Sequence, residues 1–357
     1  MTYLYGKSIF LRIALLCSII ALSIFFTVYS EVTADSALDS LVLCATSVIP
    51  SLFPFMVLSA MASRAASHFT GKNSARTAVI LPVFLGCLCG FPVGAATVAS
   101  MYRNGALSKS KAEYLCALCN NTGPAFIIGV IGRSFWGGSE IGVMFYICQI
   151  VSAVLVFTVW RIFFGKSKLT TDDLIKNDVK PSEKASGTDT FCSGFCNSVA
   201  ESAVSVVQIC GYIVFFKVIC DTVRYLVPSD TVYAILSSIL EFTSGTYAAA
   251  SLEGTLGIAL CGFSIGFSGL SVMAQSAGIL SRAGLSVSPL FRLKIFTGLV
   301  CAALSQTVYT LRDFPEAVFS ENTYSSYTLS PVISLGIIVI FAVFLTFSGI
   351  RYKLHRG

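Results

Sequence analysis

The chain has 357 residues and a formal net charge of +6; 55% of its residues are hydrophobic, 12% are charged, and its mean hydropathy is +0.80. Soluble domains carry about 25% charged residues, so this composition excludes an ordinary soluble protein. The Lys and Arg residues are scattered through short loops, which argues against nucleic acid as a partner and predicts contact with the lipid bilayer.

Apolar stretches of roughly 20 residues recur along the chain, whereas the strands of a membrane barrel would alternate in polarity over about 10 residues. Because an unpaired backbone amide is costly in hydrocarbon, such stretches form helices. The sequence therefore predicts an all-α polytopic membrane protein. The expected helical segments are 8–30, 40–63, 77–102, 111–136, 139–164, 203–226, 231–255, 256–281, 289–311 and 331–350.

The first of these segments has two interpretations. Lys7 and Arg12 precede an apolar core, and Val32-Thr33-Ala34 resembles a signal-peptide cleavage site. The apolar core is longer than the roughly 7–15 residues of a signal sequence, which favours a retained transmembrane helix. Cleavage of this segment is the alternative.

Four of the expected helices are interrupted by Gly, Pro or short polar residues, which free backbone hydrogen-bonding groups. Such backbone is tolerated at membrane depth only where protein or a polar cavity satisfies it, so we expect the breaks to face one shared site. The interruptions are 90–94, 120–124, 243–246 and 266–269.

The polar segment 165–191 divides the chain into halves that repeat one order of elements: an amphipathic entry, a helix, two broken segments and an unbroken helix. This order predicts an internal repeat. The expected organisation is an N-terminal transmembrane helix (1–34), a first repeat (35–164), a cytoplasmic polar linker (165–191), a second repeat (192–312) and a C-terminal transmembrane helix with a basic tail (313–357).

Lys and Arg collect in short cytoplasmic loops, so their positions predict the orientation of the chain. If 77–102 and 231–255 are re-entrant hairpins, most of these residues, Lys294 included, fall on the cytoplasmic side together with both termini. The first hairpin then opens inward and the second outward. The halves are thus related by inverted topology, as in many secondary transporters, with about eight crossings and two hairpins.

A hairpin tip and a broken helix from each half are expected to meet near the bilayer midplane, where helix N-termini carry partial positive charge. Such a place suits a small anionic substrate. The alternative is that the polar residues only satisfy the broken backbone or hold helices together. The residues expected to bind substrate are Gly90, Phe91, Pro92, Asn120, Asn121, Thr122, Thr243, Ser244, Gly245, Thr246, Ser268, Ser271 and Gln275, with Ser264 also available.

Glu241 lies just before the second predicted tip, and an ionisable group at that depth is costly enough to indicate a function. We expect it to couple transport to a proton or another cation. The alternative is a fixed ion pair with Lys217, the one lysine expected inside a helix.

No catalytic constellation is present in the sequence, which has no P-loop, no GxSxG and no HExxH motif. We expect neither an enzyme nor a cofactor. Cys116 and Cys119 form a CxxC spacing, but this single spacing is too weak a signal to predict a metal or redox site. Most of the 13 cysteines lie in apolar helices, where Cys acts as a small hydrophobic residue.

Three segments carry a family resemblance: Ser51-Leu52-Phe53-Pro54-Phe55, Gly90-Phe91-Pro92-Val93-Gly94-Ala95, and the run 119–129 around Asn120-Asn121-Thr122-Gly123-Pro124. They resemble the YlbJ family of sporulation integral membrane proteins, which carries a nucleoside-recognition, or Gate, domain. Gly269-Leu270-Ser271-Val272 with Gln275 looks like the matching break of the second half. Phe91 departs from the family pattern, in which tyrosine is expected.

The resemblance implies Gate-like repeats, a relation to the gates of concentrative nucleoside and ferrous iron transporters, and a place in the mother-cell membrane around the forespore. It also implies a substrate, the small aromatic dicarboxylate dipicolinate, moved toward the forespore. A nucleoside or another small solute is the alternative substrate. A non-transporting membrane protein needed for spore maturation is the alternative function, and a second copy of the chain or other sporulation membrane proteins are the partners left open.

Overall fold

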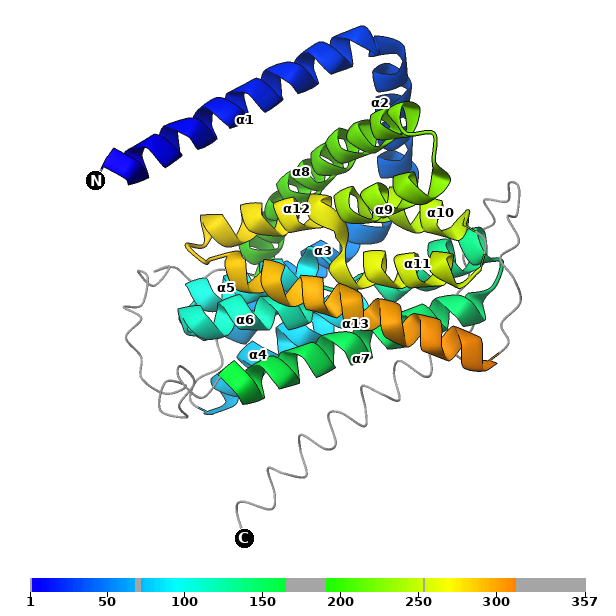
Figure 1. The fold of residues 1–357 in the computed structure, drawn as a ribbon. Coiled ribbons are helices and arrows are strands. Elements are labelled where there is room, and N and C mark those ends of the chain that lie inside the picture. The colour runs from blue at the N-terminus through cyan, green and yellow to red at the C-terminus, as the bar shows by residue number, and fades with distance from the viewer. Residues whose placement is uncertain (1, 68–71, 165–190, 253, 313–357) are drawn as a thin grey trace. The chain divides into compact units, whose positions relative to one another are not determined.

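The computed structural model describes residues 2–67, 72–164, 191–252 and 254–312. In this part of the chain every regular element is a helix, which confirms the all-α prediction (Figure 1). The predicted C-terminal helix at 331–350, and the predicted linker up to residue 190, lie outside the described residues.

The first half consists of helices that are broken wherever the sequence predicts a break. A single residue, Tyr29, separates the first two helices, which meet at 93°. The elements are α1 (Thr2–Val28), α2 (Ser30–Leu43), the π-helix η1 (Cys44–Val48), α3 (Ile49–Ser67), α4 (Lys72–Leu88), α5 (Val93–Arg103), α6 (Lys109–Cys119), the π-helix η2 (Ala125–Phe135) and α7 (Ser139–Phe164).

The second half begins with one long helix that starts at Phe191, earlier than the predicted start at residue 203. The predicted amphipathic entry is thus continuous with the helix that follows it, since no Gly–Pro break separates them. The elements are α8 (Phe191–Leu226), α9 (Asp230–Leu240), α10 (Phe242–Ala250), α11 (Thr255–Phe267), α12 (Gly269–Arg282) and α13 (Ser288–Arg312).

Within the described residues, four helical stretches are long and apolar enough to cross a membrane: Ser139–Phe163, Cys192–Leu226, Thr255–Arg282 and Ser288–Arg312. The bent pair α1–α2 makes a fifth if it counts as one span. Large apolar side chains, including Val207 and Leu311, stand exposed on these helices, as contact with lipid requires. The chain is therefore a multi-pass membrane protein.

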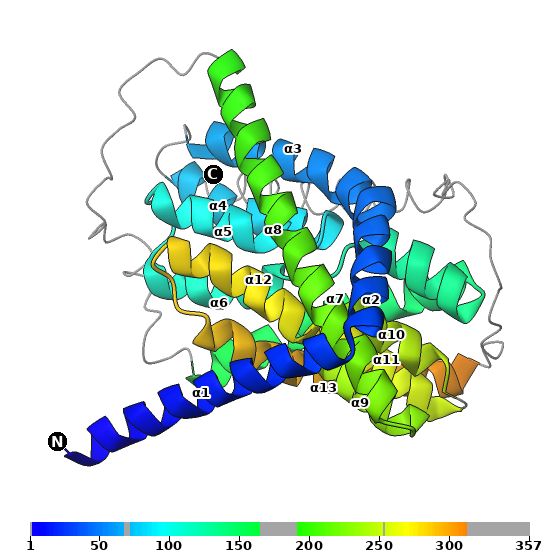
Figure 2. The ribbon, with the colours of Figure 1, turned by 90° about the horizontal axis from the view of Figure 1, so that it is seen from above.

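The closest helix packing is made by α11 and α13, which lie side by side (Figure 1). A Cβ added to Gly266 would lie 2.7 Å from the carbonyl oxygen of Thr297, so only glycine permits this approach. On another side, α8 packs against α2, α3 and α12 (Figure 2). These contacts hold the broken segments α4–α5, α6–η2, α9–α10 and α11–α12 within the helical bundle.

Candidate functional site

The first hairpin tip lies against the first break. Gly90 has φ +76°, and a Cβ there would lie 2.4 Å from the backbone nitrogen of Gly123. The backbone N–H of Phe91 donates to the carbonyl oxygen of Asn121 at 2.6 Å. The two predicted interruptions, 90–94 and 120–124, thus contact each other.

The second hairpin tip makes the equivalent contact with the second break. Gly269 has φ +73°, and a Cβ there would lie 2.9 Å from the backbone nitrogen of Phe242. The tip itself lies at Glu241, between α9 and α10, so the prediction of a break at 243–246 is wrong by two residues. Each half therefore packs its own tip on its own broken helix.

Glu241 closes the second tip as the N-cap of α10. It is 2% exposed, and its carboxylate accepts the backbone N–H groups of Thr243 at 3.0 Å and Ser244 at 2.7 Å. A carboxylate is favoured at a helix N-terminus because it satisfies free N–H groups and meets the positive end of the helix dipole. The alternative ion pair with Lys217 is wrong, since Lys217 pairs with Asp221 at 2.6 Å.

The two tips meet each other through aromatic rings. The Phe91 and Phe242 ring centroids lie 5.6 Å apart at 89°, an edge-to-face contact, and Phe126 of η2 lies 5.2 Å from Phe242. The breaks also contact across the halves, because Ser276 of α12 donates to Asn120 Oδ1 at 3.2 Å. Tips and breaks of both halves thus converge, as the sequence predicts.

Several buried polar atoms around this meeting point have no hydrogen-bond partner among the described residues. Buried polar groups in native proteins are nearly always hydrogen-bonded, so a cluster of exceptions points to a place where a polar ligand or water binds. The atoms are Asn120 Nδ2, Asn121 Oδ1, Thr122 Oγ1, Gln149 Oε1, Ser238 Oγ, Ser264 Oγ, Ser271 Oγ and Gln275 Oε1.

Other predicted residues serve the local fold. Thr246 returns its hydroxyl to the carbonyl oxygens of Phe242 and Thr243 at 3.0 Å. Gly245 lets α10 approach α9, because a Cβ there would lie 2.5 Å from Ser238 Cα. The backbone N–H groups of Thr243 and Ser244 donate to the Glu241 carboxylate, as described above. The segment 243–246 therefore stabilises the tip.

Some buried polar residues near the breaks are not among the predicted site residues. Ser276 contacts Asn120, and Gln149 of α7 donates to the carbonyl oxygen of Thr122 at 3.2 Å. Lys294 of α13, which the charge distribution predicts on the cytoplasmic side, is fully buried. The signal that could have found Gln149 and Lys294 is a polar residue inside an otherwise apolar helix.

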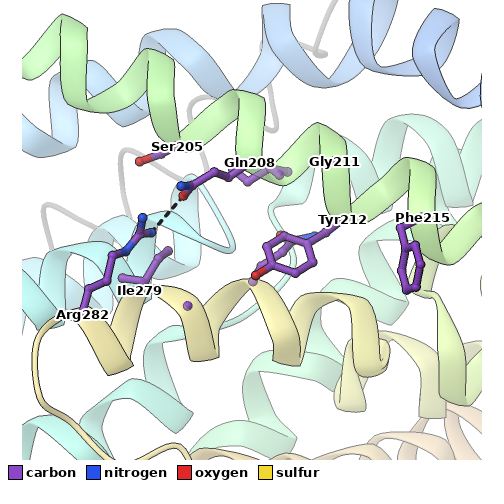
Figure 3. Close-up of a pocket in the computed structure, with 10 residues that line it drawn as sticks. Ser205, Gln208, Gly211, Tyr212, Phe215, Ile279 and Arg282 are labelled. Carbon is purple, nitrogen blue, oxygen red and sulfur yellow. Dashed lines mark hydrogen bonds between the residues drawn. The ribbon is translucent and has the colours of Figure 1, made fainter. Parts of the chain in front are cut away.

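A cavity of about 520 Å³ lies between α8 and α12 (Figure 3). Gln275 lines it, and so do Tyr212 and Phe215 from α8. At another part of its wall, Arg282 donates to Gln208 Oε1 at 2.9 Å. Gln275, which lines the cavity, is on the same helix as Ser276, the partner of Asn120.

Comparison with known proteins identifies a relative. The chain is similar to the sporulation integral membrane protein YlbJ of Bacillus subtilis (strain 168), with 23% identity over 301 residues that cover 71% of this chain and 72% of that protein. The chain is a homologue of this YlbJ protein. This confirms the family resemblance predicted from the sequence, whereas the Gate domain stays a prediction. No protein-family model and no solved structure matches the chain.

Proposed function

We propose that this chain is an integral membrane transporter of a small organic anion that acts during sporulation. The proposed substrate is dipicolinate, moved from the mother cell toward the forespore. A role in sporulation is supported by the name of the YlbJ homologue, and the substrate by the family resemblance.

One observation carries the proposal: the tip of each hairpin packs on the broken helix of its own half, and the two tips meet at Phe91 and Phe242. A scaffold protein has no need of matched breaks in both halves, whereas broken helices that meet inside a bundle form substrate sites in transporters. The buried polar atoms without partners, among them Asn121 Oδ1 and Gln275 Oε1, supply the polar groups that such a site requires.

The anionic class of substrate is supported by the helix ends at the site. The N-termini of α5, η2 and α12 carry no side-chain cap. Free N–H groups and the positive end of a helix dipole favour negative charge. Tyr212 and Phe215, in the wall of the cavity between α8 and α12, suit an aromatic ring.

The proposed architecture is an inverted repeat of two Gate-like units, 35–164 and 192–312, with α4–α5 and α9–α10 as re-entrant hairpins. Together with an N-terminal helix (1–34) and a C-terminal helix within 313–357, this gives about eight crossings. The linker at 165–191 and both termini would be cytoplasmic, in the mother-cell membrane around the forespore.

Glu241 is the proposed coupling group. Protonation of its carboxylate would remove the charge that caps α10, which links proton binding to the conformation of the second tip. The thiols of Cys44 and Cys220 are its titratable neighbours. Glu241→Gln is expected to abolish the dependence of transport on pH or an ion gradient while Glu241→Asp retains part of it; full coupling in Glu241→Gln would exclude this role.

The experiment that tests the function is the dipicolinate content of spores from a strain in which this gene is deleted. We expect a severe loss that the intact gene restores. Defective spores with normal dipicolinate would instead favour the assembly role. Uptake of a nucleoside but not dipicolinate by the purified protein would favour the alternative substrate.

A further inference from the structure

Two charged side chains are buried among the residues whose burial the structure describes, Glu241 and Lys294. Glu241 is satisfied by the N-terminus of α10, as described above. Lys294 is 0% exposed, and its Nζ has no hydrogen-bond partner among the described residues. A buried ammonium without a partner is strongly destabilising, so its presence calls for a function.

Several other cations in the described part of the chain pair with a carboxylate, and Lys294 does not. Lys217, on α8, pairs with Asp221 at 2.6 Å. Arg64 pairs with Glu201, and Arg224 with Asp230. Among the described residues, the titratable groups that act on Lys294 are the thiols of Cys116 and Cys301.

Lys294 lies beside the second break. Phe291, Lys294 and Gly298 share one face of α13, because residues three and four apart are neighbours on a helix. Phe267, the last residue of α11 before the break, contacts this face at both ends: its ring lies 6.1 Å from that of Phe291, and its Cβ would lie 2.9 Å from a Cβ added to Gly298.

Lys294 also lies beside the segment that leads into the first break. Its neighbour Cys116 is on α6, which packs against α13 and ends at Cys119, immediately before Asn120. The ammonium is therefore enclosed by the elements that carry the two breaks. Those breaks hold the buried atoms without partners described above, including Asn120 Nδ2.

We propose that Lys294 is the cationic group that binds the negative charge of the ligand between the two breaks, and that the ligand is a small carboxylate. An ammonium has three donors and strengthens its hydrogen bonds to a carboxylate when both are withdrawn from water. This inference rests on the proposed function, because it assigns a residue and a charge class to the same site. It requires a ligand that carries at least one carboxylate.

Removing the amine of Lys294 should raise the melting temperature, whereas most substitutions of buried residues lower it. Lys294→Met removes a buried charge and keeps an unbranched side chain one atom shorter, so without ligand it should melt at a higher temperature than the wild type. Lys217→Met should melt at a lower temperature, because it leaves Asp221 without its partner. Arg292→Met is the matched control, since Arg292 is an exposed cation on the same helix.

The test uses the purified full-length protein in detergent, in a low-chloride buffer, titrated with sodium dipicolinate, acetate or chloride. Dipicolinate should raise the melting temperature of the wild type and of Arg292→Met by about 3 °C or more and leave Lys294→Met unchanged. Lys294→Gln serves as the second neutral variant should Lys294→Met fail to accumulate.

In the melting experiment, either of two outcomes overturns the inference: a wild-type protein that neither dipicolinate nor acetate stabilises, or a neutral variant that dipicolinate stabilises as much as the wild type. Uptake into proteoliposomes separates the inference from the proposed function. Binding that depends on Lys294 without any uptake contradicts transport and retains the site. Equal uptake by wild type and Lys294→Met contradicts the site and retains transport.

Discussion

In the first half, α5 begins after Pro92 without a side-chain cap, and a backbone hydrogen bond from the Phe91 N–H to the Asn121 carbonyl joins the tip to the break. In the second half, α10 begins with a buried carboxylate, that of Glu241, bound to two backbone N–H groups. The second tip thus carries an internal anion, and the first does not. Glu241 shows how a carboxylate is accommodated at a helix N-terminus in this interior, which is the chemistry that we assign to the substrate.

The close backbone contact at each tip gives the largest expected effect. Gly90→Ala places a Cβ 2.4 Å from the Gly123 nitrogen at a positive φ, which should cost about 3 kcal/mol or more and lower membrane abundance sharply. Gly269→Ala, with its contact at 2.9 Å, should cost less. Gly138→Ala is the control, because a Cβ there meets nothing within 4 Å. Normal abundance and melting of Gly90→Ala would show that the tip contact is not tight.

The cap of the second tip gives the next effect. Glu241→Ala leaves the Thr243 and Ser244 N–H groups without their acceptor and should destabilise the protein by about 1–3 kcal/mol, measured by thermal melting. A second change, Lys217→Met, should add its own loss, since Lys217 pairs with Asp221. Restoration of stability by Lys217→Met would instead support an ion pair between Glu241 and Lys217.

Substitutions at the breaks should reduce transport without reducing abundance. Asn121→Ala removes a buried oxygen that has no hydrogen-bond partner among the described residues, and Ser268→Ala removes the hydroxyl at the left-handed turn between α11 and α12. We expect uptake to fall about tenfold in each. Asn104→Ala and Ser281→Ala, at exposed residues, are the matched controls. If the break variants accumulate normally and transport at the wild-type rate, the site is wrongly placed.

The orientation of the halves is tested by labelling, with little effect expected on activity. In a cysteine-free background, Asp178→Cys should react with an impermeant reagent only after permeabilisation, and Val318→Cys should react in intact cells. The background matters because Cys17, Cys192 and Cys196 are exposed. Protection of residue 318 would contradict the inverted topology.

The breaks were the part of the fold that the sequence predicted best. Gly90, Pro92, Gly123 and Pro124 disrupt a helix wherever they occur, so their effect is visible without tertiary structure. The second tip was placed two residues late because Thr243-Ser244-Gly245-Thr246 resembles a break, while the actual tip is fixed by a cap that a single carboxylate forms with backbone N–H groups.

Lys294 could not be placed from the sequence. The excess of Lys in cytoplasmic loops holds only on average, and it does not distinguish a loop lysine from one six residues after the start of α13. Its burial results from the packing of α13 against α6 and α11, which depends on contacts distant in the sequence. Lys217 and Asp221 are four residues apart on one helix. Helix spacing alone can therefore predict their ion pair.

The most direct test of the account is uptake of radiolabelled dipicolinate by proteoliposomes that contain the purified protein. We predict uptake above that of protein-free liposomes, saturation with concentration and competition by unlabelled dipicolinate. We also predict that uptake falls about tenfold in Asn121→Ala and is unchanged in Asn104→Ala. Uptake by the wild type no greater than that of protein-free liposomes, with the protein folded and inserted, would contradict transport of this anion.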